Sequence, residues 1–388
     1  MTRIYTEPQL DFCDVLFQPK RTTLNSRNEA VARRVFKFKY YPEQIVSCGL
    51  IASNMATTGT FDMAAVLEQY EAMTCFHKHI PYDQLNKHFY TYEQLQFVSI
   101  GLRDNKEEFF KLLDNNPAID KVCVDIANGY IPNLLKFVKE LRTRYPKILI
   151  MAGNVVTGDM TQDLILNGAD IIKVGIGPGS VCTTRLKTGV GRPQLSTILD
   201  CADAAHGVGG MICADGGCTN PGDISKAFGA GADFVMLGGM LAGTDEAAGK
   251  LVTKRYQTNQ IDHDTWVSTD GNIYSTDEKD PDDTLDYYTD THYVYKENKY
   301  KQFYGMSSKL AQEKHFGGMK DYRTSEGREK LIPYTGPANR VMEDILGGIR
   351  STMTYIGATK LKDIPKRTTF YIVNRQLNQV FQNCEDIQ

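Results

Sequence analysis

The sequence predicts an α/β protein whose single domain is a (β/α)8 TIM barrel. Short apolar runs rich in Val and Ile alternate with amphipathic stretches, and each run ends in glycine or polar residues. Continuous apolar runs bounded by turn signals are typical of buried parallel strands. Eight such runs follow one another: IVSCGLIASN (45–54), AMTCFHKH (72–79), QFVSIGL (96–102), KVCVDIANG (121–129), KILIMAGNV (147–155), DIIKVGIGPGS (170–180), GMICADGG (210–217) and DFVMLGGM (233–240). Eight strand and helix units in succession favour a closed barrel over an open sheet.

The stretches between these runs predict helices, for example over residues 133–145 and 159–169. In such a barrel the functional residues lie at the C-terminal ends of the strands and in the loops that follow them. Positions of this kind are occupied by Asn54, Lys78, Asp125, Asn154, Cys182, Asp215 and Gly238. Residues with only a structural role would be spread over both ends of the strands.

Composition excludes several classes of protein. The 388 residues are 41% hydrophobic and 23% charged, which is within the globular range. A net charge of -3 and a pI near 6.2 give no basic surface for a nucleic acid. No secretory signal and no long apolar run are found, so we expect a cytoplasmic protein. The nine scattered cysteines contain no Cys-x-x-Cys pair, which argues against a disulfide framework or a zinc site.

Two segments interrupt the alternation. From about residue 255 to 300 the chain is rich in Asp, Thr and Tyr, and we interpret it as an excursion inserted in the loop after strand 8. Within it, TWVSTDGNIYST carries an Asp-Gly turn and predicts a hairpin, and the acidic run is interpreted as a solvated surface rather than a cation site. Residues 315–337 are charged and contain glycine, and they predict a mobile flap over the barrel mouth. The chain then returns to helix over 345–364.

The stretch GIGPGSVCTTRLKTGVG places Cys182 between a glycine-rich turn and two basic residues, Arg185 and Lys187. Glycines allow tight backbone geometry in which several amides or carbonyls converge on one centre. A positive potential favours the thiolate, which is the nucleophilic form of cysteine. Thr184 is either a turn former or a hydroxyl that passes a proton to or from that nucleophile. Four other cysteines lie inside apolar runs and are interpreted as core residues: Cys48, Cys75, Cys123 and Cys213.

Two glycine pairs end the seventh and eighth runs, in ADGG (214–217) and LGGM (237–240). Phosphate sites of (β/α)8 barrels lie after these two strands. Paired glycines also serve as ordinary turns, but their occurrence on both strands indicates a nucleotide phosphate. The Asp215 carboxylate beside them can accept hydrogen bonds from ribose hydroxyls.

Together, GPGSVCTTRLKTGVG, ADGGCTNPGDISKAFGAGADFVMLGGM, YGMSS and DYRTSEG resemble the family of IMP dehydrogenase and GMP reductase. The resemblance runs from LDFCDVLFQPKRTTLNSR to the final helix and leaves out the excursion, where family members have a much shorter link. DFCDVLFQPK, HKH, IMAGNVVTGDM and YRTSEG are similar to the reductase branch, and the distance from FHKH to QFVSIGL is too short for the regulatory repeats that dehydrogenases usually carry there.

The resemblance implies a reaction. The flap position of Glu326 is glutamate in reductases and glutamine in dehydrogenases, and an acidic acceptor recognises the exocyclic amine that distinguishes GMP from IMP. Cys182 is then expected to attack C2 of GMP, with Thr184 and Glu326 relaying protons so that ammonia leaves and a covalent thioimidate remains. A hydride from NADPH would complete the conversion to IMP.

The same resemblance assigns the remaining site residues. Substrate-binding residues are Asp215, Gly216, Gly217, Gly238, Gly239, Gly305, Met306, Ser307, Arg323, Thr324, Ser325 and Gly327. Residues assigned to NADPH are Ser26, Arg27, Lys78, Asp125, Ile126, Ala127, Ile176, Gly177, Met306, Tyr322, Arg323, Ser351, Thr352, Met353 and Thr354. A monovalent cation such as K+ is assigned to Gly177, Gly179, Cys182 and Arg185. The resemblance also implies a homotetramer.

Two alternatives stay open at this stage. One is an IMP dehydrogenase that lacks the regulatory repeats and uses NAD, against which Glu326 argues. The other is a barrel that senses purine nucleotides without turning them over. The joint presence of Cys182, Thr184 and Glu326 argues against a sensor, which has no use for a nucleophile with a proton relay.

Overall fold

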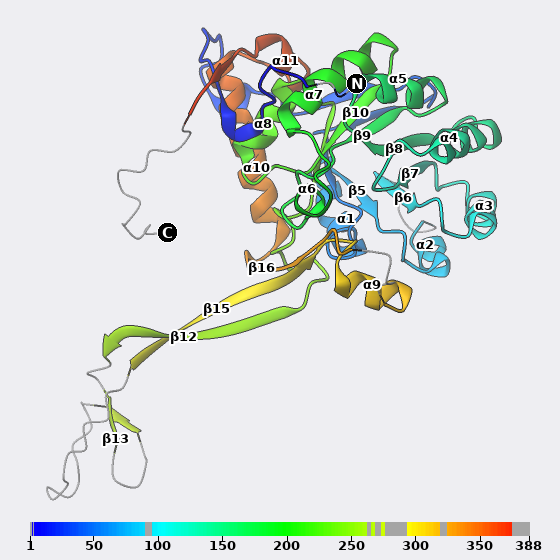
Figure 1. The fold of residues 1–388 in the computed structure, drawn as a ribbon. Coiled ribbons are helices and arrows are strands. Elements are labelled where there is room, and N and C mark those ends of the chain that lie inside the picture. Colours follow the sequence, from blue (N-terminus) through cyan, green and yellow to red (C-terminus); the bar gives the residue numbers. More distant parts are fainter. Residues whose placement is uncertain are drawn as a thin grey trace, which may run out of the picture.

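The centre of the structure, a computed structural model, is a closed barrel of eight parallel strands in the order β10-β11-β4-β5-β6-β7-β8-β9 (Figure 1). The structure describes residues 2, 4–89, 95–261, 265–267, 273–275, 293–318 and 324–374. The barrel strands are β4 (Leu50–Ala52), β5 (Met73–Phe76), β6 (Gln96–Ile100), β7 (Lys121–Asp125), β8 (Leu149–Val155), β9 (Ile171–Val174), β10 (Met211–Asp215) and β11 (Phe234–Leu237). Each predicted apolar run supplies one of them, so the predicted (β/α)8 fold is confirmed.

The first predicted run, residues 45–54, forms two strands instead of one. β3 (Gln44–Ser47) ends before Gly49, which has a φ of +77°, and only then does β4 begin. A side chain at Gly49 would also collide with the Asp233 carbonyl oxygen, 2.9 Å from the position of its Cβ. Glycine therefore permits a turn that an apolar pattern does not reveal.

β3 pairs with β2 (Arg34–Lys37) in an antiparallel hairpin that closes the N-terminal end of the barrel. Phe36 is fully buried there and stacks on Phe234 with 4.3 Å between ring centroids. The same apolar cluster contains the first residues of several barrel strands, such as Met73 and Ile171. This end of the barrel is consequently filled, and any ligand must enter from the C-terminal end.

Helices follow the barrel strands and pack around them. They are α1 (Phe61–Glu68), α2 (Tyr82–Phe89), α3 (Lys106–Asn115), α4 (Pro132–Arg144), α5 (Gly158–Leu166), α6 (Thr184–Thr188), α7 (Gln194–Gly207), α8 (Pro221–Gly229) and α10 (Ala338–Ile356). α4 and α5 confirm the helices predicted over 133–145 and 159–169, and α10 accounts for most of the predicted C-terminal helix. The apolar faces of these helices form the main core with the outward residues of the strands. In the described part of the chain, no helix has both the length and the apolar character needed to cross a membrane.

After β11 the chain forms a long antiparallel ribbon of β12 (Leu251–Ile261) and β15 (Tyr293–Tyr304), which extends away from the barrel (Figure 1). The excursion expected at about 255–300 thus begins within one strand and ends within the other. Beyond them, β13 (Thr265–Val267) pairs with β14 (Ile273–Ser275), which confirms the predicted hairpin; its turn lies outside the described residues.

The segment expected to be a flap, residues 315–337, contains regular structure. It includes β16 (Glu329–Pro333), which pairs with β15 at the base of the ribbon. α9 (Lys309–Phe316) precedes it, capped by the Ser308 hydroxyl that accepts the Ala311 amide at 3.2 Å. The flap is therefore anchored to the ribbon along its C-terminal half.

The remaining short elements bring the two ends of the described chain together beside the barrel. β1 (Val15–Phe17) pairs antiparallel with β17 (Phe370–Ile372). The other short elements are η1 (Phe12–Asp14), η2 (Arg27–Glu29), η3 (Leu361–Asp363) and α11 (Ile364–Arg367).

Candidate active site

Polar residues gather at the C-terminal ends of the barrel strands, as predicted. Asp125 is the last residue of β7, Asp215 is the last of β10, and Asn154 lies near the end of β8. Asn54, Lys78 and Gly238 follow β4, β5 and β11 by one or two residues. The open end of the barrel is thus the polar end, which is where this fold places its chemistry.

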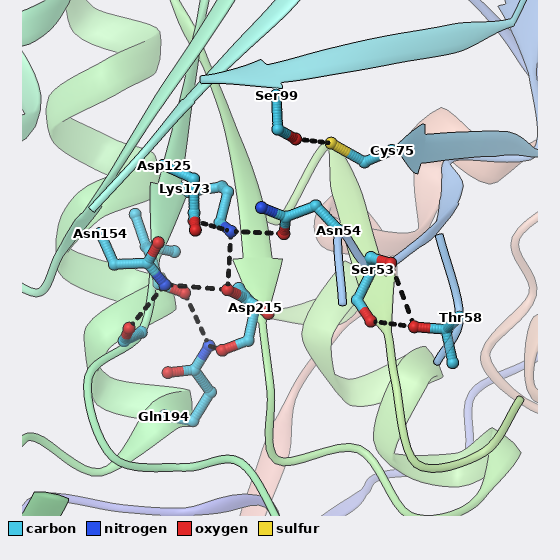
Figure 2. A network of polar contacts seen from close by, with 12 residues as sticks. Ser53, Asn54, Thr58, Cys75, Ser99, Asp125, Asn154, Lys173, Gln194 and Asp215 are labelled. Atoms are coloured by element: carbon cyan, nitrogen blue, oxygen red, sulfur yellow. Dashed lines mark hydrogen bonds and ion pairs between the residues drawn. The ribbon is translucent and has the colours of Figure 1, made fainter. Parts of the chain in front are cut away.

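Lys173, on β9, lies at the centre of a polar network at this end (Figure 2). Its ammonium donates to the carboxylate of Asp125 at 2.5 Å and to the side-chain oxygen of Asn54 at 3.1 Å, and it lies 3.2 Å from the carboxylate of Asp215. The Asn154 amide donates to the same Asp215 carboxylate at 2.9 Å. The network therefore joins residues from five barrel strands or the loops that follow them.

The charges of this network shift the pKa values of its members. Burial acts to lower the pKa of the Lys173 ammonium, but the carboxylates of Asp125 and Asp215 outweigh burial and hold the pKa well above its ordinary value. Burial acts to raise the pKa of the Asp125 carboxyl, and the positive charge of Lys173 reverses this, so its pKa lies below the usual range. Lys173 is accordingly protonated and Asp125 ionised at neutral pH.

Sequence reasoning missed Lys173. The signal was present, because a lysine inside the otherwise apolar strand IIKV can stay charged only with partners. No spacing rule, however, indicated which carboxylates would face it.

Cys182 lies in the loop between β9 and α6, and this loop is paired with the flap segment. An isolated antiparallel bridge joins Cys182 to Gly327. The Arg328 amide donates to the Val181 carbonyl at 2.9 Å, and the Thr183 amide donates to the Glu326 carbonyl at 2.8 Å. These backbone contacts bring two segments more than a hundred residues apart into register.

The pairing brings the three predicted catalytic residues together. The Cys182 thiol donates to the Thr184 hydroxyl at 3.3 Å, and that hydroxyl donates to the Glu326 carboxylate at 2.9 Å. All three side chains are half-buried, so this series of hydrogen-bonded groups remains accessible to a ligand at the open end of the barrel. The arrangement can remove a proton from the thiol and hold it at a carboxylate.

The guanidinium of Arg185 binds other groups rather than the Cys182 thiol. Its guanidinium lies 3.2 Å from the Asp11 carboxylate and donates to the Arg192 carbonyl at 2.7 Å. Its side chain also passes within 2.5 Å of the position that a Cβ on Gly177 would take, so a side chain there would displace it. We had expected Arg185 and Lys187 to create a positive potential at the cysteine, but the structure gives Arg185 partners of its own and leaves Lys187 exposed.

Both glycine pairs approach the loop that carries Cys182. Gly216, with a φ of +90°, approaches the backbone of Gly179, whose amide nitrogen lies 3.1 Å from the position of a Cβ. Gly239 approaches the Ser180 hydroxyl in the same way, also at 3.1 Å. Glycine is thus required at Gly216 by both its φ and its surroundings, and the backbone of residues 178–180 lies close to both glycine pairs.

Gly305, Met306 and Ser307 lie against the flap. A Cβ on Gly305 would be 3.2 Å from the Gly327 Cα, and the Ser325 hydroxyl donates to the carbonyls of Gly327 and Ser307 at 2.7 and 3.4 Å. The Met306 sulfur accepts the Ala56 amide at 3.3 Å. These assigned substrate residues therefore form one cluster with Cys182. Thr324 is the first described residue after the gap at 319–323, and Tyr322 and Arg323 lie in that gap, outside the described residues.

The residues assigned to NADPH fall into two groups. Lys78, Asp125, Ile126 and Ala127 lie at the open end, with Ile176 and Gly177 in the neighbouring β9 loop. The Lys78 ammonium lies 3.6 Å from the Asp104 carboxylate. A cation and a carboxylate at one mouth suit a ligand that carries both phosphate and ribose hydroxyls.

The second group lies elsewhere in this chain. Ser26 and Arg27 belong to η2 and its cap, and the run Ser351, Thr352, Met353 and Thr354 forms the C-terminal part of α10, against which η2 packs. The Gly357 that ends α10 approaches the Arg21 carbonyl in the N-terminal segment. Helices of this fold run opposite to the strands, so this part of α10 lies toward the closed end of the barrel (Figure 1).

Among the described residues, no group of three or more His, Cys, Asp or Glu side chains is arranged to hold a metal ion. The predicted K+ site would use backbone carbonyls instead, which are suitable ligands for that ion. The carbonyls of Gly179 and Arg185 accept amides of their own loop, from Cys182 at 3.0 Å and Gly189 at 3.1 Å. A carbonyl oxygen has a second lone pair, so these contacts are compatible with a cation.

Comparisons with known proteins agree with the resemblance. A family model described as the IMP dehydrogenase / GMP reductase domain matches residues 9–263 and 289–378. A GMP reductase of Shigella boydii serotype 18 is 45% identical over 98% of this chain and 99% of its own length. A GMP reductase of Escherichia coli (strain K12 / DH10B) gives the same values. Residues 264–288, beyond the long ribbon, lie outside the family match.

Proposed function

This chain belongs to the IMP dehydrogenase / GMP reductase family, and from that premise we propose that it catalyses the reductive deamination of GMP to IMP with Cys182 as the nucleophile. It is an oxidoreductase of the GMP reductase type. The observation that carries the assignment of residues is the hydrogen-bond chain from Cys182 through Thr184 to Glu326.

The first half of the reaction replaces the amine of GMP. The Cys182 sulfur bonds to C2 of the purine while its proton passes through the Thr184 hydroxyl to Glu326. The proton returns to the exocyclic amine, the C2–N bond breaks, and ammonia leaves. The purine then remains attached to Cys182 as a thioimidate.

The second half releases the product. NADPH, when bound, supplies a hydride that reduces C2. The C2–S bond then breaks with its electron pair on sulfur, so Cys182 leaves as a thiolate and IMP is free. Because the thiol proton has left with ammonia, a proton from water restores the Cys182 thiol through Glu326 and Thr184 before the next cycle.

The chain's own residues bind and orient the two ligands. We propose that Asp215, Gly216, Gly217, Gly238, Gly239 and Ser307 hold the ribose and phosphate of GMP, supported by the close approach of both glycine pairs to the loop that carries Cys182. Lys78 and Asp125 would hold phosphate and ribose groups of NADPH, supported by their common position at the barrel mouth. The second group, on η2 and α10, stays an assignment by resemblance.

Three finer properties are also proposed. Carbonyls of Gly177, Gly179, Cys182 and Arg185 would hold K+ and stiffen the cysteine loop. The protein would act as a homotetramer in the cytoplasm. A reducing compartment is supported by eight described cysteines that are all free thiols.

A paired spectroscopic assay tests the proposed function. Purified protein with K+ is given GMP and NADPH in one cuvette, and IMP and NAD in the other. We expect NADPH to be consumed only with GMP, with one ammonia released per NADPH. Formation of NADH from IMP would instead make the protein a dehydrogenase, and no reaction in either cuvette would favour a nucleotide sensor.

A further inference from the structure

Lys173 occupies a place in the barrel wall where a charge is costly. Its side chain is only 2% exposed, and its neighbours along β9 are fully buried apolar residues. A buried ammonium is stable only with close anionic and hydrogen-bonding partners. Its presence in a strand of this core therefore calls for a reason beyond packing.

The partners of Lys173 use its full donor capacity. An ammonium has three N–H donors, and three oxygens surround this one: those of Asn54 at 3.1 Å, Asp125 at 2.5 Å and Asp215 at 3.2 Å. Figure 2 shows that these partners reach Lys173 from different strands. No donor is left over, so a shift of one partner changes the hydrogen bonds that the other two receive.

The two carboxylates are not enclosed as Lys173 is. The side chains of Asp125 and Asp215 are 32% and 25% exposed, and both lie at the open end of the barrel. Each carboxylate has lone pairs that Lys173 does not use, and those can accept hydroxyl groups from a ligand. Lys173 thus holds from behind two carboxylates that can accept hydrogen bonds from a ligand.

We propose that Lys173 is a positioning residue that couples the GMP site to the NADPH site by holding Asp215 and Asp125 on one ammonium. The proposal rests on the proposed function, which gives Asp215 to GMP and Asp125 to NADPH. When a ligand fixes one carboxylate, Lys173 fixes the other, and the second ligand meets a site that is already ordered. Binding of either ligand therefore favours binding of the other.

The test is the effect of NADP+ on GMP binding, measured by calorimetry. NADP+ carries the same ribose and phosphate groups as NADPH but cannot donate a hydride, so GMP is not reduced to IMP, and ammonium in excess returns any thioimidate to GMP. In the wild type we expect saturating NADP+ to lower the Kd of GMP by about fivefold or more. In Lys173→Met, the Kd of GMP without NADP+ divided by the Kd with NADP+ should fall to near one. The KM values of both GMP and NADPH should rise.

Lys121→Met is the matched control. Lys121 is also on a barrel strand, its side chain is 7% exposed, and it pairs with an aspartate, Asp120, at 2.6 Å. It lies at the start of β7, near the closed end. Loss of this lysine should lower the melting temperature and leave the NADP+ effect on GMP binding at its wild-type value.

A wild type without coupling, or a folded Lys173→Met protein with the wild-type ratio, would overturn the proposal. If Lys173→Met does not fold, Asp125→Asn replaces it: this change at the NADPH residue should raise the Kd of GMP even without cofactor, and an unchanged Kd would overturn the proposal equally. Failure of the proposed function is seen separately, as a wild type that binds both ligands yet does not oxidise NADPH with GMP.

Discussion

The two ends of the barrel contain similar groups in opposite settings. At the closed end, Lys121 pairs with Asp120 at 2.6 Å, and the Tyr41 hydroxyl donates to the same carboxylate at 2.5 Å. At the open end, Lys173 holds Asp125 and Asp215. The Asp120 carboxylate is 30% exposed, much like Asp125 at 32% and Asp215 at 25%, so exposure does not separate the two ends. They differ in their surroundings: the β2–β3 hairpin and an apolar cluster fill the closed end, whereas at the open end carboxylates from two strands converge on one lysine.

The difference teaches how one barrel separates stability from chemistry. At the closed end Lys121, Asp120 and the Tyr41 hydroxyl are bound to one another and an apolar cluster fills the strand ends, so changes there should alter the free energy of unfolding. At the open end, polar groups keep unused hydrogen-bonding capacity, so changes there should alter ligand binding and rate. Each prediction below tests whether the two ends are in fact independent.

The largest effect is expected for Cys182→Ala at the open end. Without the sulfur no covalent intermediate can form, and turnover of GMP should fall by a factor on the order of 10⁴ or more. Binding of GMP should persist, because the phosphate and ribose contacts remain. Steady-state assays and calorimetry check both parts, and Cys13→Ala, at an exposed thiol, should keep wild-type activity. Near-normal turnover in Cys182→Ala would refute the covalent mechanism.

Phe36→Ala probes the closed end. Phe36 is fully buried and stacks on Phe234, so its truncation leaves a cavity and should cost about 3–5 kcal/mol of unfolding free energy. The KM for GMP should not change in the folded variant. Val35→Ala is the control, since Val35 is 52% exposed on the same strand and should cost less than about 0.5 kcal/mol. A large change in KM for Phe36→Ala would show that the two ends are coupled.

Thr184→Val removes the middle of the proton relay without changing its size. We expect kcat to drop about a hundredfold or more, because the thiol and Glu326 lose the hydroxyl that connects them. The melting temperature should change little. Thr188→Val, four residues along on the exposed side of α6, should leave kcat within about twofold. Equal kcat values for Thr184→Val and Thr188→Val would show that Thr184 does not relay protons in the reaction.

His206 offers the smallest effect, a pH dependence near the closed end. Its ring lies 2.8 Å from the Asp233 carboxylate, and that hydrogen bond raises the pKa of His206 above its ordinary value of 6.5. The stabilisation is therefore fully present below about pH 6.5 and is lost as the pH rises through the folded-state pKa. The ring is 46% exposed, so the pair should add less than about 1 kcal/mol to the free energy of unfolding.

Denaturant unfolding of the wild type and His206→Gln at pH 5.5 and 8.5 checks this. The free energy of unfolding of the wild type should exceed that of the variant by more at pH 5.5 than at pH 8.5. A difference that is the same at both pH values, or larger at pH 8.5, would contradict the assigned shift. Turnover of GMP should be alike in the two proteins at both pH values.

The sequence predicted the barrel because periodicity is local, and each apolar run ends in a residue such as Asn54 or Asp215 that reaches the mouth. It did not predict the break at Gly49, since a left-handed residue leaves the apolar pattern unchanged. Cys182 and Thr184 could be proposed from the glycine-rich stretch that contains them, but Glu326 was added only through the resemblance, because it is far from Cys182 in the chain and the two meet through backbone pairing. Lys173 was missed because its role depends on which side chains converge from neighbouring strands.

The separation of the two groups assigned to NADPH could not be predicted from the sequence either. Motif matching places residues in order along the chain but says nothing about which end of the barrel they occupy. Ser26 and Ser351 carry no local signal that distinguishes the mouth from the outer surface. Only the packing of η2 against α10 shows where they lie.

The central claim is that the open end breaks the C2–N bond of GMP on Cys182 before any hydride is transferred. Isotope exchange tests it most directly: the wild type is incubated with GMP, NADP+ and ¹⁵N-labelled ammonium, and the recovered GMP is analysed by mass spectrometry. Reversible formation of the thioimidate predicts ¹⁵N in the exocyclic amine with the wild type and none with Cys182→Ala. A wild type that reduces GMP with NADPH yet incorporates no label, or a Cys182→Ala variant that incorporates it, would contradict the account.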